Sequence, residues 1–230
     1  MSVVSPNLRT RVRAIATPIA VAMGKVGLTP NALTLIGFGI AIIAAGAAVL
    51  QSWILAGFLV VFGGVFDLFD GALARATGKT SKLGAFMDSV FDRWGEVVIY
   101  VGIVWGCING GLPEGAVLAS AAMASAVMVS YARAKSEGLG FTEGTGMAAI
   151  GLAPREVRIV ILTIGLIVAG VAGGVGWYPV PEGQVRIDDP LRGGSIPLLL
   201  SLGLIALLAT ITVIQRIVHV LRQPQPEENQ

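Results

Sequence analysis

The chain has 230 residues, of which 54% are hydrophobic and only 13% carry a charge. Long runs of Ala, Val, Ile, Leu and Gly recur between short polar breaks. This composition excludes an ordinary soluble domain and indicates a helical protein that crosses a membrane several times. The single cysteine, Cys107, excludes an intrachain disulfide bond.

The first predicted element is a helix over residues 7–24, where Arg alternates with apolar residues at helical spacing. Such an amphipathic helix lies on a membrane surface, and no cleavable signal peptide is evident before it. Thr29 and Pro30 are residue types that cap a helix and occupy its first position. Six apolar segments of about 20 residues follow, each long enough to span the hydrocarbon core. They are Ala32–Leu50, Trp53–Ala74, Ala85–Ile108, Gly115–Ala134, Val157–Val175 and Ile196–Val218.

The expected fold is an all-α membrane protein with six transmembrane helices preceded by a cytoplasmic amphipathic helix. Residues 1–222 are expected to form one domain, with spans running from 32 to 218. The Pro-, Gln- and Glu-rich residues 223–230 are expected to be a disordered tail.

Basic residues are strongly biased toward one side of these spans, and such residues mark the cytoplasmic side. The other side receives only Arg186 and Arg192. We therefore expect a multi-pass protein of the cell membrane with both termini in the cytoplasm. The cytoplasmic set is Arg9, Arg11, Arg13, Lys25, Arg75, Lys79, Lys82, Arg133, Lys135, Arg155, Arg158, Arg216 and Arg222.

Four aspartates interrupt the second and third spans. Asp67 and Asp70 share one helix face, as do Asp88 and Asp92 on the next helix. A short turn makes the two spans antiparallel neighbours, so the four carboxylates can meet near the cytoplasmic surface. Carboxylates within a membrane are costly and need a partner, and hard oxygen ligands suit Mg²⁺ or Mn²⁺. Ion pairs between helices are the alternative, but few bases lie within these spans.

The residues around the aspartates suggest a site for a diphosphate. Gly71 leaves room for a ligand beside the helix backbone, and the Arg75 guanidinium suits a diphosphate. Ser81 can donate to a phosphate or a base. The first turn of span one offers free N–H groups at a positive helix end; it comprises Asn31, Ala32, Leu33 and Thr34. The simpler alternatives are a snorkelling Arg75 and an ordinary capped helix start.

The segment from Asp67 to Asp92 has the pattern D-x2-D-G-x2-A-R-x8-G-x3-D-x3-D. It resembles the signature of the CDP-alcohol phosphotransferase family at every defined position. The resemblance implies a phosphatidyl transfer from CDP-diacylglycerol to an alcohol with release of CMP. It also implies two metal ions, Mg²⁺ or possibly Mn²⁺, held by the four aspartates, with Asp92 taking the proton from the attacking hydroxyl. The span-one turn would help to hold the cytidine nucleotide, and relatives suggest a homodimer without a nucleic-acid partner.

Two segments resemble the phosphatidylinositol phosphate synthase branch of that family. Arg93 follows the last aspartate, and Ser130–Gly138 matches that branch's S-Y-x-[KR]-A-[RK]-x-E-G. Before span five the branch carries E-R-P-E-R, and this chain keeps its two arginines, Arg155 and Arg158, but not the P-E between them. The identity of the acceptor alcohol is therefore left open. Inositol 1-phosphate is the expected acceptor; glycerol 3-phosphate, free inositol or another alcohol remain alternatives. The predicted acceptor-phosphate ligands, which could also be plain flanking charges, are Arg133, Lys135, Arg155, Arg158 and Arg216.

A cation transporter would also carry acidic residues inside the membrane. It would, however, distribute them along the full depth of the bundle. Here the acids of the spans gather at the cytoplasmic end, which favours the enzyme over the transporter.

Overall fold

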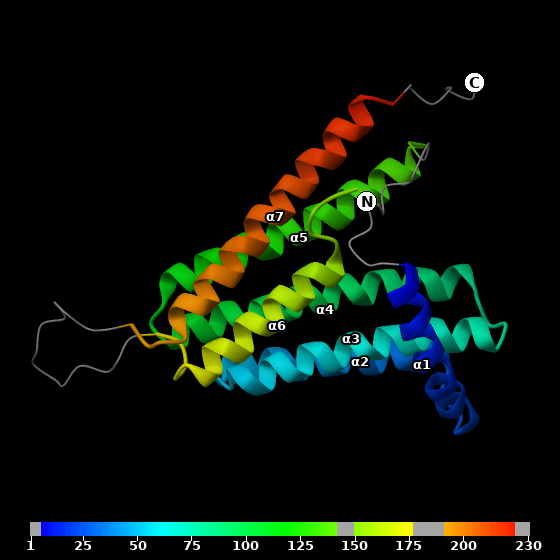
Figure 1. Cartoon of the computed structure of the whole chain (residues 1–230), viewed down its shortest axis with the longest axis horizontal. Coiled ribbons are helices and arrows are strands. Elements are labelled where there is room, and N and C mark those ends of the chain that lie inside the picture. The colour runs from blue at the N-terminus through cyan, green and yellow to red at the C-terminus, as the bar shows by residue number, and fades with distance from the viewer. Residues whose placement is uncertain (1–5, 142–149, 177–190, 224–230) are drawn as a thin grey trace, which may run out of the picture.

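The computed structural model describes residues 6–141, 150–176 and 191–223. Within those ranges the chain forms seven α-helices (Figure 1). Each of the six predicted apolar segments is helical, as is the segment before them. The helices are α1 (Pro6–Lys25), α2 (Pro30–Val49), α3 (Trp53–Ala76), α4 (Lys82–Asn109), α5 (Pro113–Gly138), α6 (Arg155–Val171) and α7 (Ser195–Leu221).

Helices α2 and α4 both begin at side-chain caps. The Ala32 N–H donates to Thr29 Oγ1 over 3.2 Å, and Pro30 is the first residue of α2, as predicted. The Gly84 N–H donates to Ser81 Oγ over 2.9 Å. These caps satisfy amide groups that a helix start leaves without partners, and they fix where the two helices begin.

Helix α2 packs along both α3 and α4, while α3 and α4 touch each other only slightly. Glycines allow this close approach. A Cβ at Gly37 would come within 3.5 Å of Phe66 Cβ on α3, and a Cβ at Gly102 would overlap the Ala45 carbonyl of α2. The prediction that α3 and α4 are direct neighbours was therefore wrong for most of their length, because small residues draw α2 against both helices.

The remaining helices complete an up-and-down bundle. Helix α6 packs against α3 and α7, and α5 packs against α4 and α7. In Figure 1, α5 and α7 lie together and diverge from the α2–α3–α4 group. Successive helices reverse direction. The start of α2, the end of α3, the start of α4 and the start of α6 therefore lie at the same end of the bundle.

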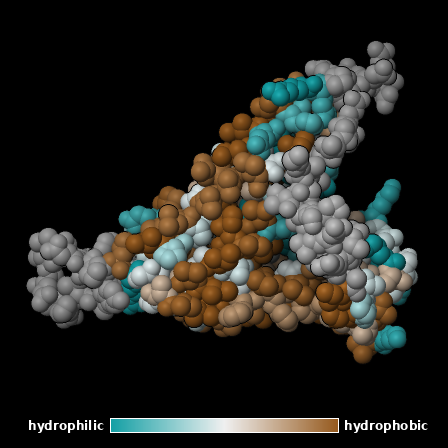
Figure 2. Space-filling view, viewed as in Figure 1, coloured by the Kyte–Doolittle hydropathy of each residue, from teal (hydrophilic) through white to brown (hydrophobic). Residues whose placement is uncertain are grey.

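Among the helices of the described residues, four are long and apolar enough to cross a membrane: α2, α3, α5 and α7. Helix α4 is interrupted by charged residues in its first half. Helix α6 has 17 residues, and it ends at Val171 rather than at the predicted Val175, because Gly173 and Gly174 adopt positive φ angles of 97° and 86°. Hydrophobic residues cover much of the visible bundle, and hydrophilic ones gather toward its ends (Figure 2).

Helix α1 lies across the bundle at the end where α3 finishes (Figure 1). Its Ala16 and Ala20 are buried in one cluster with Leu33, Ala72 and Leu73. The predicted tail falls outside the described residues except for Gln223, as does Arg186.

Candidate active site

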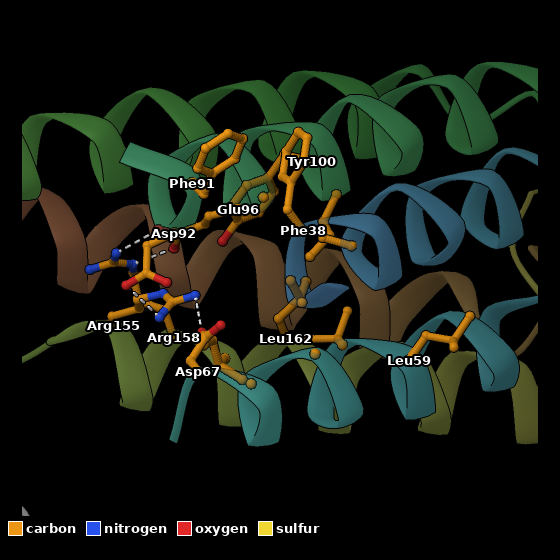
Figure 3. Close-up of a pocket in the computed structure, with 18 of the residues that line it drawn as sticks. Phe38, Leu59, Asp67, Phe91, Asp92, Glu96, Tyr100, Arg155, Arg158 and Leu162 are labelled. Atoms are coloured by element: carbon orange, nitrogen blue, oxygen red, sulfur yellow. Dashed lines mark hydrogen bonds and ion pairs between the residues drawn. The ribbon is translucent and has the colours of Figure 1, made fainter. Parts of the chain in front are cut away.

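Asp67 of α3 and Asp92 of α4 are joined by one guanidinium. Arg155, the first residue of α6, places Nη2 2.7 Å from Asp67 Oδ2 and Nη1 2.9 Å from Asp92 Oδ2 (Figure 3). Two acids from different helices therefore lie within reach of a single planar cation. Bidentate contacts of this kind fix the orientation of an arginine.

Asp70 and Asp88 lie beside this pair. Asp70 is buried on α3 and accepts a hydrogen bond of 2.6 Å from Thr34 Oγ1 of α2. Asp70 and Asp88 line the same cavity of about 180 Å³. Asp70 is also close enough to Asp67 and Asp88 for the three charges to repel one another. The tertiary structure thus brings all four predicted aspartates to one end of the bundle.

The donor set fits a divalent cation by its chemistry. Arg155 pairs with Asp67 and Asp92, whereas Asp70 and Asp88 form no ion pair with the described basic residues, so a cation could neutralise their charge. Hard carboxylate oxygens are the ligands that Mg²⁺ and Mn²⁺ prefer. Within the described ranges, no three acidic, His or Cys side chains are already gathered as a metal cage. A metal ion would have to draw the aspartates closer and take over contacts that Arg155 now makes.

The cavity beside Asp70 contains most of the residues predicted to hold the nucleotide donor. A Cβ at Gly71 would lie 3.1 Å from Arg75 Nη1, so the guanidinium folds over the glycine. Ser81 uses its oxygen as a helix cap, which leaves its hydroxyl hydrogen free to donate. The predicted residues that line this cavity are Asn31, Thr34, Gly71, Arg75 and Ser81.

Ala32 and Leu33 do not line that cavity. The Ala32 N–H donates to the side chain of Thr29. The Leu33 N–H donates to the backbone carbonyl of Thr29 over 3.1 Å. The Leu33 side chain is buried in an apolar cluster. The expectation of free N–H groups at these two positions was therefore wrong, because Thr29 caps this helix start.

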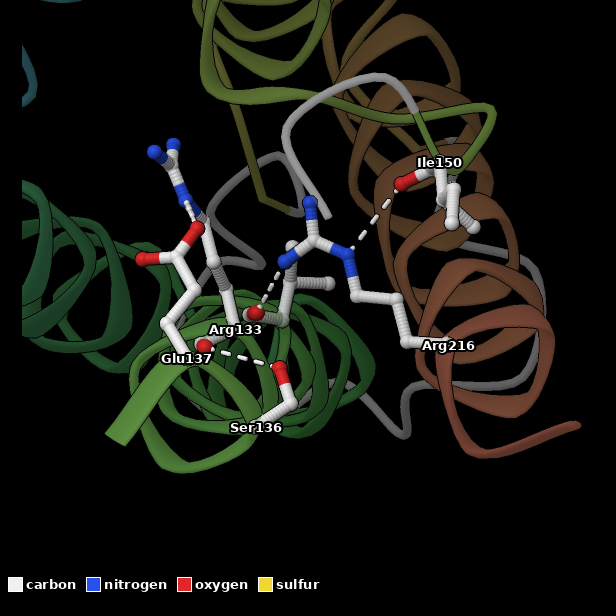
Figure 4. Close-up of polar contacts among 6 residues, drawn as sticks. Arg133, Ser136, Glu137, Ile150 and Arg216 are labelled. Carbon is white, nitrogen blue, oxygen red and sulfur yellow. Dashed lines mark hydrogen bonds and ion pairs between the residues drawn. The ribbon is translucent and has the colours of Figure 1, made fainter. Parts of the chain in front are cut away.

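Of the five predicted acceptor-phosphate ligands, Arg155 is the one that contacts the aspartates. Arg133 and Arg158 lie close enough to Arg216 for their charges to repel it. The Arg158 guanidinium is buried and pairs with Glu96 at 2.9 Å. Arg216 donates to the backbone carbonyls of Ile150 and Val129 (Figure 4). Arg133 pairs with Glu137 on its own helix at 2.8 Å, and Lys135 is exposed.

Glu96 was not among the residues predicted for the site. Glu96 lies one turn beyond Asp92 on α4 and lines a cavity of about 40 Å³ with Asp67, Asp92, Arg155 and Arg158 (Figure 3). Its spacing of four residues from Asp92 indicates that both acids lie on the same face of α4. Its partner could not be read from the sequence, because Arg158 lies 62 residues further along the chain.

The fold and the site define a polytopic helical protein with a carboxylate cluster at one end of its bundle. The sequence model of the CDP-alcohol phosphatidyltransferase family matches residues 27–183. The chain belongs to this family, which makes it a transferase and sets aside the transporter alternative.

Named relatives cover most of the chain. An archaetidylinositol phosphate synthase of Pyrococcus horikoshii is 40% identical over 74% of this chain and 85% of its own length. A phosphatidylinositol phosphate synthase of Streptomyces avermitilis is 34% identical over 91% of this chain and 79% of its own.

The fold is also similar to that of a solved enzyme. The phosphatidylinositol phosphate synthase of Mycobacterium tuberculosis, solved with CDP-DAG bound, superposes with a TM-score of 0.73 at 25% identity, over 92% of this chain and 96% of that one. A second structure of that enzyme was solved in complex with manganese and citrate.

Proposed function

We propose that the protein transfers a phosphatidyl group from CDP-diacylglycerol to inositol 1-phosphate and releases CMP. One observation carries the assignment of a phosphorylated acceptor. The Nε–H of Arg155 is buried and has no hydrogen-bond partner among the described residues, although the same guanidinium contacts Asp67 and Asp92. A buried donor without a partner is costly, and a phosphate oxygen would satisfy it.

The aspartates supply the metal site in this proposal. Asp67, Asp70 and Asp88 would hold two Mg²⁺ ions, with Mn²⁺ as a substitute, and Asp92 would contact the second ion. Bound ions of this kind neutralise the charge that develops on a phosphate leaving group. The manganese in the structure of the mycobacterial enzyme supports the use of a divalent cation.

Asp92 is the proposed general base. The acceptor hydroxyl oxygen forms a bond to the lipid-bearing phosphorus, the bond from that phosphorus to the CMP oxygen breaks, and the hydroxyl proton passes to an Asp92 carboxylate oxygen. The Arg155 guanidinium lies 2.9 Å from the Asp92 carboxylate. A phosphate bound to Arg155 is therefore oriented beside this carboxylate. Such positioning lowers the entropic part of the barrier.

The donor nucleotide occupies the cavity beside Asp70. The missing side chain of Gly71 lets the nucleotide approach the helix backbone, and Arg75 lies over that glycine. Ser81 donates its free hydroxyl hydrogen to a phosphate or a base of the nucleotide. Asn31 and Thr34 complete this wall of the cavity. Arg133, Lys135, Arg158 and Arg216 were also predicted to bind the acceptor phosphate, and that role stays a prediction.

The chain is proposed to be one domain over residues 1–222 with six spans, α2 to α7. Helix α1 lies on the cytoplasmic surface of the cell membrane, and both termini face the cytoplasm. The transverse position of α1 at the site end supports this arrangement (Figure 1). It would place the acidic cluster within reach of a water-soluble acceptor. A homodimer, implied by the family resemblance, stays a prediction.

A second candidate concerns the lipid donor alone. The relative that is 40% identical carries the name archaetidylinositol phosphate synthase, so a CDP-linked archaetidyl lipid could replace CDP-diacylglycerol. The polar site described above contacts the diphosphate and the acceptor, and these are common to both donors.

The test is a transfer assay with purified protein, Mg²⁺ and labelled acceptors. CMP release and a labelled lipid product are expected with inositol 1-phosphate and CDP-diacylglycerol. Glycerol 3-phosphate and free inositol should give no product, and CDP-archaeol should be compared as donor. Incorporation of glycerol 3-phosphate without inositol 1-phosphate would overturn the acceptor assignment.

A further inference from the structure

Two ion pairs lie one helical turn apart between α4 and α6. Asp92 pairs with Arg155, and Glu96 pairs with Arg158 (Figure 3). The two acids are four residues apart and the two arginines three apart, so each pair of side chains shares a helix face. The first arginine lies at the proposed acceptor site, whereas the second is fully buried behind it.

The Arg158 guanidinium is already occupied by protein groups. Its Nε and Nη2 each donate to one Glu96 carboxylate oxygen over 2.9 Å, and its Nη1 donates to the Ala153 carbonyl over 2.8 Å. Its relative exposure is 1%. A substrate phosphate could reach Arg158 only by breaking a buried bidentate pair, which is costly when one partner remains unpaired.

The Ala153 carbonyl connects this pair to the chain that leads into α6. The N–H groups of Leu152 and Ala153 both donate to Thr212 Oγ1 of α7 over 3.0 Å. Arg158 therefore joins α4 to the segment just before Arg155, and α7 anchors that segment from its other side. The position of Arg155 relative to α4 depends on these contacts.

We propose that Glu96 and Arg158 form a positioning pair that holds Arg155 where it binds the acceptor phosphate. This assigns Arg158 a different role from the direct phosphate contact predicted from the sequence. The inference rests on the proposed function, since the acceptor must carry a phosphate for Arg155 to matter.

The decisive variant is Glu96→Gln, which keeps the shape of the side chain and removes its charge. Removing an acid near an anion site should by itself favour binding of the anion. If Glu96 positions Arg155, the KM for inositol 1-phosphate instead rises about 10-fold, because a small displacement of the Arg155 guanidinium strongly weakens binding of the acceptor phosphate. The KM for CDP-diacylglycerol should stay within about twofold of wild type.

Arg158→Gln should show the same acceptor defect, and the double variant should be no worse than either single one, because both changes break one interaction. The control is Glu114→Gln at the opposite end of the bundle, which should leave every parameter unchanged. If Glu96→Gln does not fold, Glu96→Asp keeps the charge but shortens the reach, and a selective rise in acceptor KM is again expected.

An acceptor KM that is unchanged or lower in the Glu96 variants would overturn the positioning role. Lack of wild-type turnover with inositol 1-phosphate would instead count against the proposed function. In that event calorimetric binding of inorganic phosphate decides the inference, with weaker binding expected in Glu96→Gln than in wild type and equal binding refuting it.

Discussion

Arg155 should compete with the metal ions that the acidic cluster binds. Its guanidinium contacts Asp67 and Asp92 simultaneously, at 2.7 and 2.9 Å. Both aspartates are predicted metal ligands, so a cation can use these oxygens only after Arg155 has moved. Replacing Arg155 with Gln, which is uncharged, should therefore strengthen metal binding in the absence of substrate.

The size of the effect follows from the two ion pairs. The side chains of Arg155, Asp67 and Asp92 are 30%, 21% and 15% exposed, so solvent partly screens both ion pairs. Pairs of this kind contribute about 0.5–1 kcal/mol each. Releasing both would change the binding free energy by about 1–2 kcal/mol, which corresponds to a metal Kd that is about 5- to 30-fold lower.

Calorimetry or electron paramagnetic resonance with Mn²⁺ and lipid-free protein would measure this Kd. Arg222→Gln is the control, because Arg222 is exposed at the end of α7. It should change the Kd by about twofold or less, since an exposed charge without a direct contact is well screened. A weaker or unchanged Mn²⁺ affinity in Arg155→Gln would show that Arg155 does not block the metal ligands.

Further outcomes are expected at other positions. Asp92→Asn should retain binding of metal and CDP-diacylglycerol, measured calorimetrically, but lose turnover; near-normal rates would exclude Asp92 as the base. Thr34→Val removes the 2.6 Å hydrogen bond to Asp70 and should cost about 1.5–3 kcal/mol of stability, seen as a lower unfolding temperature. Gly151→Ala should destabilise the protein by at least about 1–3 kcal/mol, because its φ is +124° and a Cβ would overlap Thr212; an unchanged unfolding temperature would contradict this. Chelation by EDTA should abolish CMP release, and added Mg²⁺ should restore it.

The helices, and the four aspartates that gather at one end of the bundle, could be predicted from the sequence. Runs of apolar residues set the segments, because an apolar stretch of that length needs internally satisfied backbone groups. Thr29 and Pro30 act locally, so their capping geometry follows from residue type and neighbouring positions. The spacing of the four aspartates likewise determined which of them share a helix face, since α-helical periodicity is local.

The contacts between distant segments were decided only by the tertiary structure. Glycines such as Gly37 and Gly102 let α2 approach both α3 and α4, and which helix a glycine admits depends on the packing of the whole bundle. Five basic residues that looked alike in sequence have different partners: Arg155 contacts the aspartates, Arg158 pairs with Glu96, and Arg216 donates to backbone carbonyls. A charge can be counted from the sequence, but its partner is fixed by the fold, because a buried ion finds its counter-ion wherever packing brings one close.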